Sequence, residues 1–533
     1  MNSPPPPLAQ VDWSGQLRVL AARFGNRIAA RDGLGNAMSY AEFSARAHAV
    51  AVHLLTQGLH PGTPVASLLP NSLEAIWVSF GLKLAGLSEV PLGWGYTTDE
   101  IRWCAQVSGA RILITREPRA ALAAEAGLEP MMSADIPLHD GGETLPPVPG
   151  STPGRILFTS GTTGRPKGVL ASHGRRWIGE QLQKACLPFM PQPGSKILLM
   201  TPFVHGSGLL SGAWFDCGGE VTLHDGVDPA RVRPLLESGG YEAMFAPPTV
   251  LAKLVSAFDG ASLPGLRCIF TGTQPLARGL YERARQMFGP VVRITYGKTE
   301  CINPITTLTF TELDEAFAEA PAAGGSCTGW PAPGVEIRIG HPHEPPRATG
   351  EEDEVWLRAS QQSDGLITAD GFRPHEPDGW HATGDLGVLD SRGRLWLTGR
   401  VADVIKTGGY RVNPDEVESA LAGMRTCTQA AITSLPSDYW GEIIIAVIEQ
   451  PRDGWREELD SRVNVLSRHK RPRLFVEMAA LPRNPQGKVS RKKLRETVLA
   501  QHTLIDGPYP ALEAIPDSSA NPVKRQETLP PGG

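Results

Sequence analysis

Residues 158–168 gather three glycines, several hydroxyl side chains and one lysine, and this segment constrains the fold more than any other. Gly161, Gly164 and Gly168 can adopt positive φ, so successive backbone N–H groups can point inward together. Residues 155–158, an arginine followed by three apolar residues, predict a strand that enters this loop. Hydroxyl donors and one mobile cation complete the set of groups suited to a polyphosphate: Thr159, Ser160, Thr162, Thr163 and Lys167.

The segment differs from a P-loop, in which Gly-Lys-Ser/Thr follows four spacer residues. Here Pro166 precedes Lys167, and Gly168 follows it. A Ser/Thr/Gly-rich surface linker is the alternative interpretation, but linkers rarely combine a preceding strand with a Pro-Lys-Gly end. The pattern therefore indicates another class of nucleotide enzyme.

Composition excludes several other classes of protein. The formal net charge of -5 gives no general attraction for nucleic acid, so we expect no nucleic-acid partner. Seven scattered cysteines, none in a C-x-x-C pair, argue against a disulfide framework or a zinc site and favour a reducing compartment. No signal-peptide pattern or membrane-length apolar stretch is evident, so we expect a cytoplasmic protein without a membrane span.

Apolar periodicity predicts helices that alternate with short strands, which is typical of parallel or mixed sheets covered by helices. The clearest predicted elements are helices at 40–59 and 73–85 and strands at 64–69 and 88–92. No internal repeat of fixed period is present.

The length of 533 residues exceeds the size at which one hydrophobic core keeps growing, which predicts two or more domains. After residue 400 a compact, charged stretch of ~105 residues is long enough for a separate domain, although charge could equally mark a solvated face of a single domain. We expect a large domain at 13–399, a small domain at 400–505 and disordered tails at 1–12 and 506–533.

Four further motifs follow the loop in order, at residues 296–300, 379–387, 399–410 and 484–492. With the loop, they resemble the signatures of the adenylate-forming superfamily, which includes acyl-CoA synthetases, adenylation domains and luciferases. The resemblance extends from about residue 17 to 498 and is strongest to the acyl-CoA synthetases. It implies an α/β fold, with a large N-terminal AMP-binding domain of stacked β-sheets, helices and a distorted barrel. A small mobile C-terminal α+β domain would act as a lid.

The resemblance also implies nucleotide-binding roles. Tyr296 would stack on adenine, Thr299 would contact the α-phosphate, and Glu300 would hold Mg²⁺, a cation that prefers oxygen ligands. Asp385 would accept hydrogen bonds from the ribose hydroxyls, and Arg400 would reach ribose or phosphate. The alternative for residues 296–300 is a simple turn with a helix cap. The alternative for residues 379–387 is an aspartate in a glycine-rich turn. Gly297, in the same motif as Tyr296, is a further expected nucleotide contact, and Gly272 and Thr273 are weaker ones.

Residues 399–410 resemble the hinge between the two domains of this family. Relatives usually carry Asp or Lys two places after the arginine, whereas this chain has Ala402 followed by Asp403. Either Ala402 is the pivot, or the hinge works differently. The resemblance implies that Gly408 and Gly409 shape the tunnel through which a thiol enters.

Lys488 matches the catalytic lysine of the C-terminal motif, and Gly487 would free the turn that presents it. A lysine is a compact, mobile charge that can bridge a substrate carboxylate and the α-phosphate. A surface lysine in a basic tail is the alternative interpretation.

Three residues bear on the acid substrate. His205 matches the family position that faces the acyl pocket, although a satisfied core histidine is the alternative. Amino-acid-activating relatives carry an aspartate at the next position, where this chain has Gly206, so an unpaired ammonium disfavours an α-amino acid. Lys298 replaces a usually neutral residue and could pair with a distal anionic group of the acid. Alternatively, it turns to solvent or pairs with a local carboxylate such as Glu300.

The implied reaction joins a small carboxylic acid to a thiol in two steps. The acid and MgATP form an acyl-adenylate and pyrophosphate, and coenzyme A then displaces AMP. The expected cofactors are ATP, Mg²⁺ and coenzyme A, and the expected assembly is a monomer or homodimer. Two other acceptors remain open, namely the phosphopantetheine arm of an acyl carrier protein and a non-thiol nucleophile. A non-catalytic nucleotide-binding protein is disfavoured by the presence of Lys488, Glu300 and Asp385.

Overall fold

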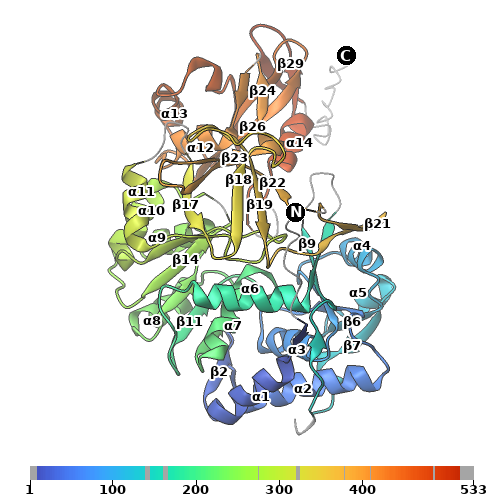
Figure 1. The fold of residues 1–533 in the computed structure, drawn as a ribbon. Helices are drawn as coiled ribbons and strands as arrows, with labels where there is room; N and C mark the ends of the chain where they lie inside the picture. The colour runs from blue at the N-terminus through green and yellow to red at the C-terminus, as the bar shows by residue number, and fades with distance from the viewer. Residues whose placement is uncertain are drawn as a thin grey trace, which may run out of the picture. The chain divides into compact units, whose positions relative to one another are not determined.

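The structure is a computed structural model, shown as a ribbon in Figure 1. It describes residues 9–138, 144–159, 166–273, 275–319, 325–376, 378–408, 410–483 and 487–515, without the side chains of His205 and Arg411. The chain forms two compact units, and the boundary between them falls between Ala402 and Asp403.

The local elements expected near the N-terminus are confirmed. They are α2 (Tyr40–Thr56), β4 (Pro64–Leu68), α3 (Leu73–Leu84) and β5 (Ser88–Leu92). A capping box begins α2, because the side chains of Ser39 and Glu42 each bind the other residue's backbone N–H. Gly81 lets α2 and α3 approach closely, since a Cβ at this position would lie 2.5 Å from the Cβ of Val50.

An eight-stranded sheet carries the predicted strand that enters the loop. Its strand order is β21-β20-β10-β9-β5-β4-β6-β7. The strands not yet defined are β6 (Ile112–Thr115), β7 (Glu129–Met132), β9 (Pro153–Thr159), β10 (Lys167–Ser172), β20 (Gly365–Thr368) and β21 (Gly371–Pro374). Helices α4 (Thr98–Ser108) and α5 (Ala120–Glu125) contribute Ile101, Cys104 and Ala123 to the core beside β4 and β5.

A seven-stranded sheet has the order β15-β14-β13-β11-β12-β2-β3 and is parallel from β15 to β2. Its strands are β2 (Ile28–Arg31), β3 (Ala37–Ser39), β11 (Lys196–Leu199), β12 (Glu220–Leu223), β13 (Ala243–Phe245), β14 (Cys268–Gly272) and β15 (Val292–Thr295). Helices α8 (Pro229–Glu237), α9 (Pro248–Ala257) and α10 (Arg278–Phe288) share a core with it (Figure 1). Helices α6 (His173–Ala185) and α7 (Gly208–Asp216) contact one another.

A six-stranded antiparallel sheet forms the expected distorted barrel. Its order is β16-β17-β23-β22-β19-β18, and it is nearly closed because β18 also comes close to β17. The strands are β16 (Thr306–Thr307), β17 (Ser326–Pro331), β18 (Val335–Ile339), β19 (Asp353–Ala359), β22 (His381–Leu389) and β23 (Leu395–Arg400). The expected α/β fold class, with stacked sheets and a barrel-like part, is confirmed.

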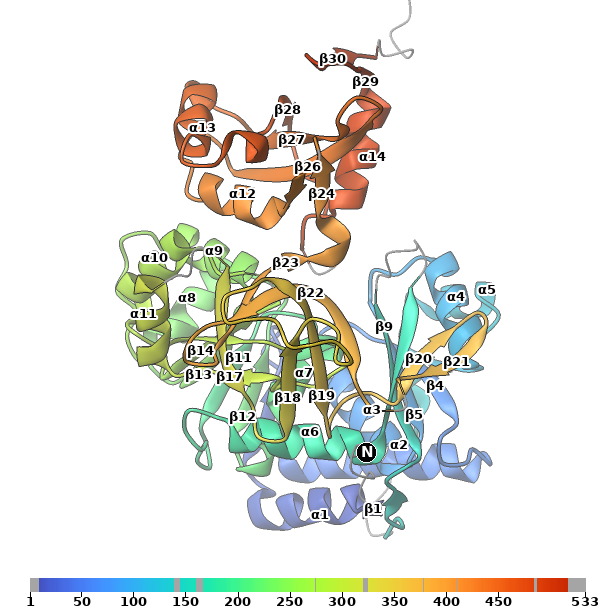
Figure 2. The same ribbon diagram turned by 45° about the horizontal axis from the view of Figure 1, so that its top comes forward.

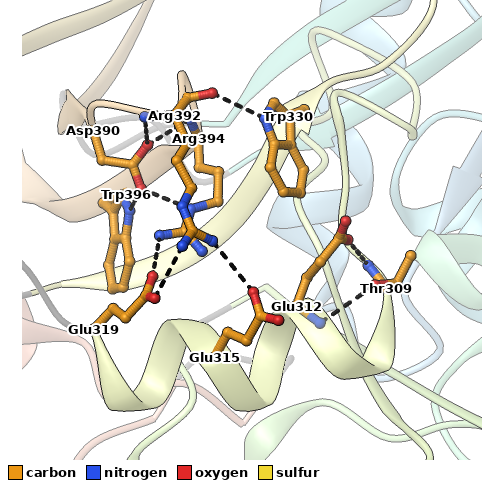
Figure 3. A network of polar contacts seen from close by, with 9 residues as sticks. All are labelled: Thr309, Glu312, Glu315, Glu319, Trp330, Asp390, Arg392, Arg394 and Trp396. Atoms are coloured by element: carbon orange, nitrogen blue, oxygen red, sulfur yellow. Dashed lines mark hydrogen bonds and ion pairs between the residues drawn. The ribbon is translucent and has the colours of Figure 1, made fainter.

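A buried arginine holds the turn between β22 and β23 against α11 (Phe310–Ala318), as Figure 3 shows. The side chain of Arg394 is 3% exposed and binds Asp390 at 2.7 Å and Glu319 at 3.0 Å. The indole of Trp396 donates a further hydrogen bond to Asp390. This network secures one end of the β22–β23 hairpin, whose other end carries Asp385 and Arg400.

The small unit is an α+β unit whose central strands are covered on both faces. Its strands are β24 (Ile405–Thr407), β25 (Tyr410–Val412), β26 (Gln429–Ser437), β27 (Gly441–Glu449) and β28 (Leu474–Met478). Ile444 packs in a core with α12 (Pro414–Leu421) and α13 (Trp455–Val463), whereas its neighbour Ile443 packs with α14 (Arg491–Gln501). Figure 2 shows α13 and α14 on opposite sides of these strands. Burial of both faces explains the almost continuous apolar run of β27.

Parts of both expected tails, residues 9–12 and 506–515, are described and contain secondary structure. At the start, β1 (Gln10–Val11) pairs with β8 (Val148–Pro149), and Asp12 caps α1 (Trp13–Phe24). At the other end, β29 (His502–Ile505) and β30 (Ala511–Ala514) form a hairpin.

Asp506, at the start of the second expected tail, is ordered by hydrogen bonds. Its carboxylate accepts them from the hydroxyl of Ser437 at 2.5 Å and from the backbone N–H of Asp438 at 2.6 Å. Composition suggested a tail here, but these tertiary contacts order the segment. None of the helices in the described part of the chain combines the length and the apolar character that a membrane crossing requires.

Candidate active site

Several predicted site residues follow neighbouring strands of the seven-stranded sheet. Strands β15, β14, β13 and β11 are adjacent and parallel, so their carboxyl ends meet at one edge of the sheet. Such an edge is where ligands bind in open α/β sheets. The residues that follow are 296–300 after β15, 273 after β14 and 200–208 after β11.

The end of β14 is sterically crowded. A Cβ at Gly272 would lie 2.3 Å from the carbonyl oxygen of Thr295, so this position requires glycine. The next residue, Thr273, has a φ of 69°, which is rare for a β-branched residue. Strain of this kind concentrates at functional sites. The two residues predicted as weaker nucleotide contacts thus form a tightly constrained corner.

The segment with His205 is a short π-helical turn, Phe203–Ser207. Such turns are rare and frequently occur at functional sites. Two residues that sequence reasoning missed support it. The side-chain oxygen of Asn71 accepts a hydrogen bond from the backbone N–H of Phe203 at 3.0 Å, and Arg155 in β9 donates to the carbonyl of Val204 at 2.9 Å. The His205 side chain itself lies outside the described part of the structure.

Residues 298–301 form a tight turn after β15. The backbone N–H of Lys298 donates to the carbonyl of Cys301, and the reverse bond is also made, each at 3.2 Å. Thr299 and Glu300 therefore lie at the tip of this turn, and both are half-buried. The carbonyl of Glu300 accepts a hydrogen bond from the backbone N–H of Ser363 at 2.8 Å, which fixes the tip against the segment before β20.

Asp385 is 4% exposed, and its carboxylate is the centre of a polar cluster. Its Oδ2 accepts hydrogen bonds from the Tyr296 hydroxyl at 2.6 Å and from the Lys298 ammonium at 3.1 Å. Its Oδ1 lies 2.8 Å from the guanidinium of Arg400. The ammonium of Lys298 also donates to the carbonyl of Thr383 at 2.5 Å. We call these five residues the Asp385 cluster.

Strand register explains part of the cluster. Asp385 and Arg400 are direct cross-strand partners in the β22–β23 pair, so the two motifs meet through sheet pairing. Thr383 stabilises the bend before Asp385, because its hydroxyl accepts from the N–H of Asp385 at 3.0 Å and donates to the carbonyl of Val355 at 2.6 Å. Sequence reasoning did not single out Thr383, although it lies within the motif at 379–387.

The protonation states in and beside the cluster follow from burial. Burial, and then Asp385, raise the pKa of the Tyr296 phenol well above its ordinary value, so the phenol remains a donor. Burial lowers the pKa of His381 to about 3, and His375 and Lys298 add to this effect. His381 is therefore neutral at physiological pH.

The predicted phosphate loop connects β9 and β10. Lys167 and Thr159 are cross-strand partners, so they close the base of the loop. The indole of Trp103 donates to the carbonyl of Pro166 at 2.8 Å, which secures the residue before Lys167. The predicted contacts at the loop itself lie outside the described residues; they are Ser160, Gly161, Thr162, Thr163 and Gly164.

The remaining candidates lie after residue 402 in the chain. Lys488 is half-buried and lies in a loop that is closed by a bridge between Arg483 and Val489. Gly487, just before it, has a φ of 80°, which glycine adopts without strain. Gly408 has a φ of 55°, and a Cβ there would lie 3.2 Å from the ring of Trp440. Gly409 lies outside the described residues.

A second charged cluster in the small unit was missed by sequence reasoning. Arg491 at the start of α14 binds three carboxylates, with Asp403 and Glu418 each at 2.7 Å and Asp415 as the third. Its Nε also donates to the carbonyl of Ile432 at 3.2 Å. We call these residues the Arg491 cluster. In the local sequence, only the arginine three places after Lys488 pointed to this cluster. Its carboxylate partners are about 70 to 90 residues away in sequence.

Comparison with known families and proteins gives consistent results. Residues 17–366 match the model of the family described as AMP-binding enzyme, and residues 416–488 match the AMP-binding enzyme C-terminal domain. Feruloyl-CoA synthase from an Amycolatopsis species is 27% identical over 481 residues, which cover 86% of this chain and 94% of that protein. A 2-succinylbenzoate–CoA ligase from Geobacillus kaustophilus is 28% identical over 497 residues, which cover 89% and 95% respectively.

Among solved structures, this chain is similar to o-succinylbenzoate coenzyme A synthetase from Bacillus subtilis in complex with its acyl-adenylate intermediate. The TM-score is 0.80 at 25% identity, with 91% of this chain and 98% of that chain covered. The first family match alone spans residues 17–366 of the 533 in the chain. The chain therefore belongs to the AMP-binding enzyme family.

Proposed function

We propose that this chain is an AMP-forming carboxylic acid–CoA ligase. Its family and its relatives, which are named as CoA ligases, support the reaction class. The observation in the chain itself that carries the proposal is the Asp385 cluster. It joins a buried carboxylate suited to a ribose to the turn that presents Thr299 and Glu300, at the sheet edge where ligands of α/β proteins bind.

In the first step, an oxygen of the substrate carboxylate attacks the α-phosphorus of ATP. A new P–O bond forms, the bond to the β-phosphate oxygen breaks, and pyrophosphate leaves. We assign Asp385 to the ribose, Tyr296 to the adenine, Thr299 to the α-phosphate and Lys488 to the developing negative charge. Lys167 and the loop 160–165 would hold the β- and γ-phosphates.

Magnesium fits this site as a partner of ATP. Mg²⁺ is usually bound by one or two protein carboxylates together with substrate phosphates. Among the described residues, no three His, Cys, Asp or Glu side chains converge as a metal cage. The half-buried Glu300 at the tip of its turn offers the single carboxylate that such a nucleotide-bound cation needs. The cation would neutralise phosphate charge as pyrophosphate leaves.

In the second step, the sulfur of coenzyme A gives up its proton to solvent and attacks the acyl carbon. A thioester forms, the bond between the acyl carbon and the AMP oxygen breaks, and AMP leaves with the bonding electrons. Gly408 and Gly409 would border the path of the thiol. We assign the change between the two steps to rotation of the small unit about Ala402. The ion pair between Asp403 and Arg491 supports this pivot, because it makes Asp403 part of the small unit.

The acid itself is defined only by class. Gly206 offers no counter-charge to an ammonium, so we propose an acid without an α-amino group, with His205 facing its acyl part. Lys298 was a candidate for reading a distal acidic group of the substrate. Its ammonium instead binds Asp385 and the Thr383 carbonyl, which favours the alternative of a local ion pair, with Asp385 in place of Glu300.

The test is pyrophosphate release across a panel of carboxylic acids, followed by mass detection of the product with coenzyme A or a carrier protein. We expect acid-dependent pyrophosphate release and an acyl-CoA product. A thioester formed only on the carrier protein would support that alternative acceptor. Pyrophosphate release without a thioester on either thiol would support a non-thiol acceptor. No ATP binding, together with no pyrophosphate release from any acid, would contradict the proposal.

A further inference from the structure

We propose that Lys298 is a positioning residue that fixes the spacing between the ribose-binding carboxylate and the phosphate-binding turn. This inference rests on the proposed function. The backbone of Lys298 closes the turn that presents Thr299 and Glu300, and its side chain extends to Asp385. One residue thus joins two groups that would bind different parts of the same nucleotide.

The contacts of Lys298 hold it firmly. Its side chain is 9% exposed, and its ammonium has two partners on β22, the Thr383 carbonyl at 2.5 Å and the Asp385 carboxylate at 3.1 Å. A charge-assisted hydrogen bond in such a site is stronger than one in water. The carbonyl partner also gives the ammonium a fixed direction, which an ion pair with Asp385 alone would not.

Lys298 and Arg400 contact the same carboxylate but differ in exposure. The side chain of Arg400 is 52% exposed, against 9% for Lys298. A carboxylate offers about four acceptor positions, and Tyr296, Lys298 and Arg400 occupy three of them here. A ribose with two hydroxyls needs two positions. Arg400 can therefore exchange for a ribose hydroxyl, while Lys298 stays in place and keeps the carboxylate oriented.

A role in reading the acid would need a different geometry. To reach a distal group of the acid, the ammonium would have to leave both partners on β22, and Asp385 would lose one of its two cations. An uncompensated buried charge is costly. The positioning role requires no such rearrangement.

The experiment compares nucleotide binding by four proteins, which are the wild type, Lys298→Met, Lys298→Gln and Lys184→Met. Lys298→Gln keeps a hydrogen-bond donor without the charge. Lys184→Met is a matched control, because Lys184 forms an ion pair of 2.8 Å with Asp216 between α6 and α7. Dissociation constants of ATP, 2′-deoxy-ATP and 3′-deoxy-ATP are measured by equilibrium dialysis with Mg²⁺. Circular dichroism and thermal unfolding identify any variant that fails to fold.

We expect Lys298→Met to weaken ATP binding by about tenfold, the size of one lost charge-assisted hydrogen bond, and to weaken binding of the deoxy nucleotides much less. The preference for ATP over its deoxy analogues should therefore fall. Lys298→Gln should lie between the wild type and Lys298→Met, and Lys184→Met should match the wild type. An equal loss for all three nucleotides, or none, would contradict the positioning role.

Two further readouts separate this inference from the proposed function. With the turn less constrained, Lys298→Met should need more Mg²⁺ for half-maximal pyrophosphate release, and kcat/KM should fall by the same factor for every acid. A loss confined to acids with a distal carboxylate would show that Lys298 reads the substrate. If the wild type binds no ATP, the proposed function fails, whereas an unchanged Lys298→Met variant contradicts only this inference.

Discussion

The Asp385 cluster contains more cationic than anionic side chains, whereas the Arg491 cluster contains more anionic than cationic ones. In the large unit, one carboxylate is shared by two cations and a phenol. In the small unit, one guanidinium is shared by three carboxylates. The first cluster carries an excess of positive charge and includes a half-exposed arginine. The second carries an excess of negative charge, and its four charged side chains are between 19% and 33% exposed.

This difference fits the ligand site that we propose at Asp385 and a structural role for the Arg491 cluster. Excess positive charge and one exchangeable partner suit a cluster that receives an anionic nucleotide. Burial alone would lower the pKa of Arg491, but Glu418, Asp415 and Asp403 together raise it, so the guanidinium is firmly charged. The Arg491 cluster ties the first residue of the small unit to α12 and to the start of α14. Arg491 follows Lys488 by three residues, so the clamp also anchors the segment that presents that lysine.

The largest effect is expected from Arg491→Met, which leaves three carboxylates without their cation. Removal of one partner from a buried ion pair typically costs about 3 to 5 kcal/mol. We expect a loss of this order in the free energy of unfolding of the small unit, measured by urea denaturation. The matched control is Arg456→Met, which removes a 46%-exposed pair with Asp460 and should cost less than about 1 kcal/mol. Similar losses for both variants would show that the Arg491 cluster is no clamp.

Lys488→Ala should affect chemistry and leave the clamp intact. We expect pyrophosphate release to fall by about 10²- to 10³-fold, as for the loss of one group that stabilises charge in the transition state. Thioester formation from a supplied acyl-adenylate should be largely retained, because we assign the lysine to the first step. Both half-reactions are measured separately, with the unfolding free energy as the control. An equal loss in the two half-reactions would contradict this division of roles.

Glu418→Gln tests how the excess negative charge of the Arg491 cluster affects the pH dependence of stability. Burial raises the pKa of Glu418 against the lowering effect of Arg491, so its folded-state pKa lies above its unfolded value. Its contribution to stability is therefore greatest below the unfolded pKa and is lost as pH rises through the folded pKa. We expect Glu418→Gln to gain stability relative to the wild type as pH rises above the ordinary pKa of a glutamate. Urea unfolding at several pH values measures this difference, and a constant offset would contradict the raised pKa.

The smallest effect on stability is expected from Arg400→Met. Because Arg400 is half-exposed and Asp385 keeps Lys298 and Tyr296, the free energy of unfolding should change by less than about 1 kcal/mol. Nucleotide affinity should fall, since the variant removes a cation near the ribose or phosphate. Thermal unfolding with and without ATP measures both quantities. A loss of unfolding free energy as large as that of Arg491→Met would show that the Asp385 cluster, like the Arg491 cluster, mainly stabilises the fold.

Several features of the fold followed from local pattern. The elements at Tyr40–Thr56 and Leu73–Leu84 have apolar spacing that favours helices, and the strand before the phosphate loop is confirmed as part of Pro153–Thr159. Composition placed Asp506 in a tail, whereas its carboxylate accepts hydrogen bonds from residues about 70 positions earlier in the chain. Composition reports the average preference of a segment and not the contacts that it finds.

The candidate site also has features that local motifs indicated and features that only tertiary contacts decided. Motif order in the sequence identified the family, the reaction class and the candidate residues, because the chemistry of phosphate and ribose binding restricts residue types at short spacing. The partners of those residues were decided by tertiary structure. Asp385 meets Arg400 through strand register and meets Lys298 across 87 residues, and Arg491 reaches Asp403 across 88. Ion pairs at such separations depend on sheet order and burial, which local sequence patterns do not encode.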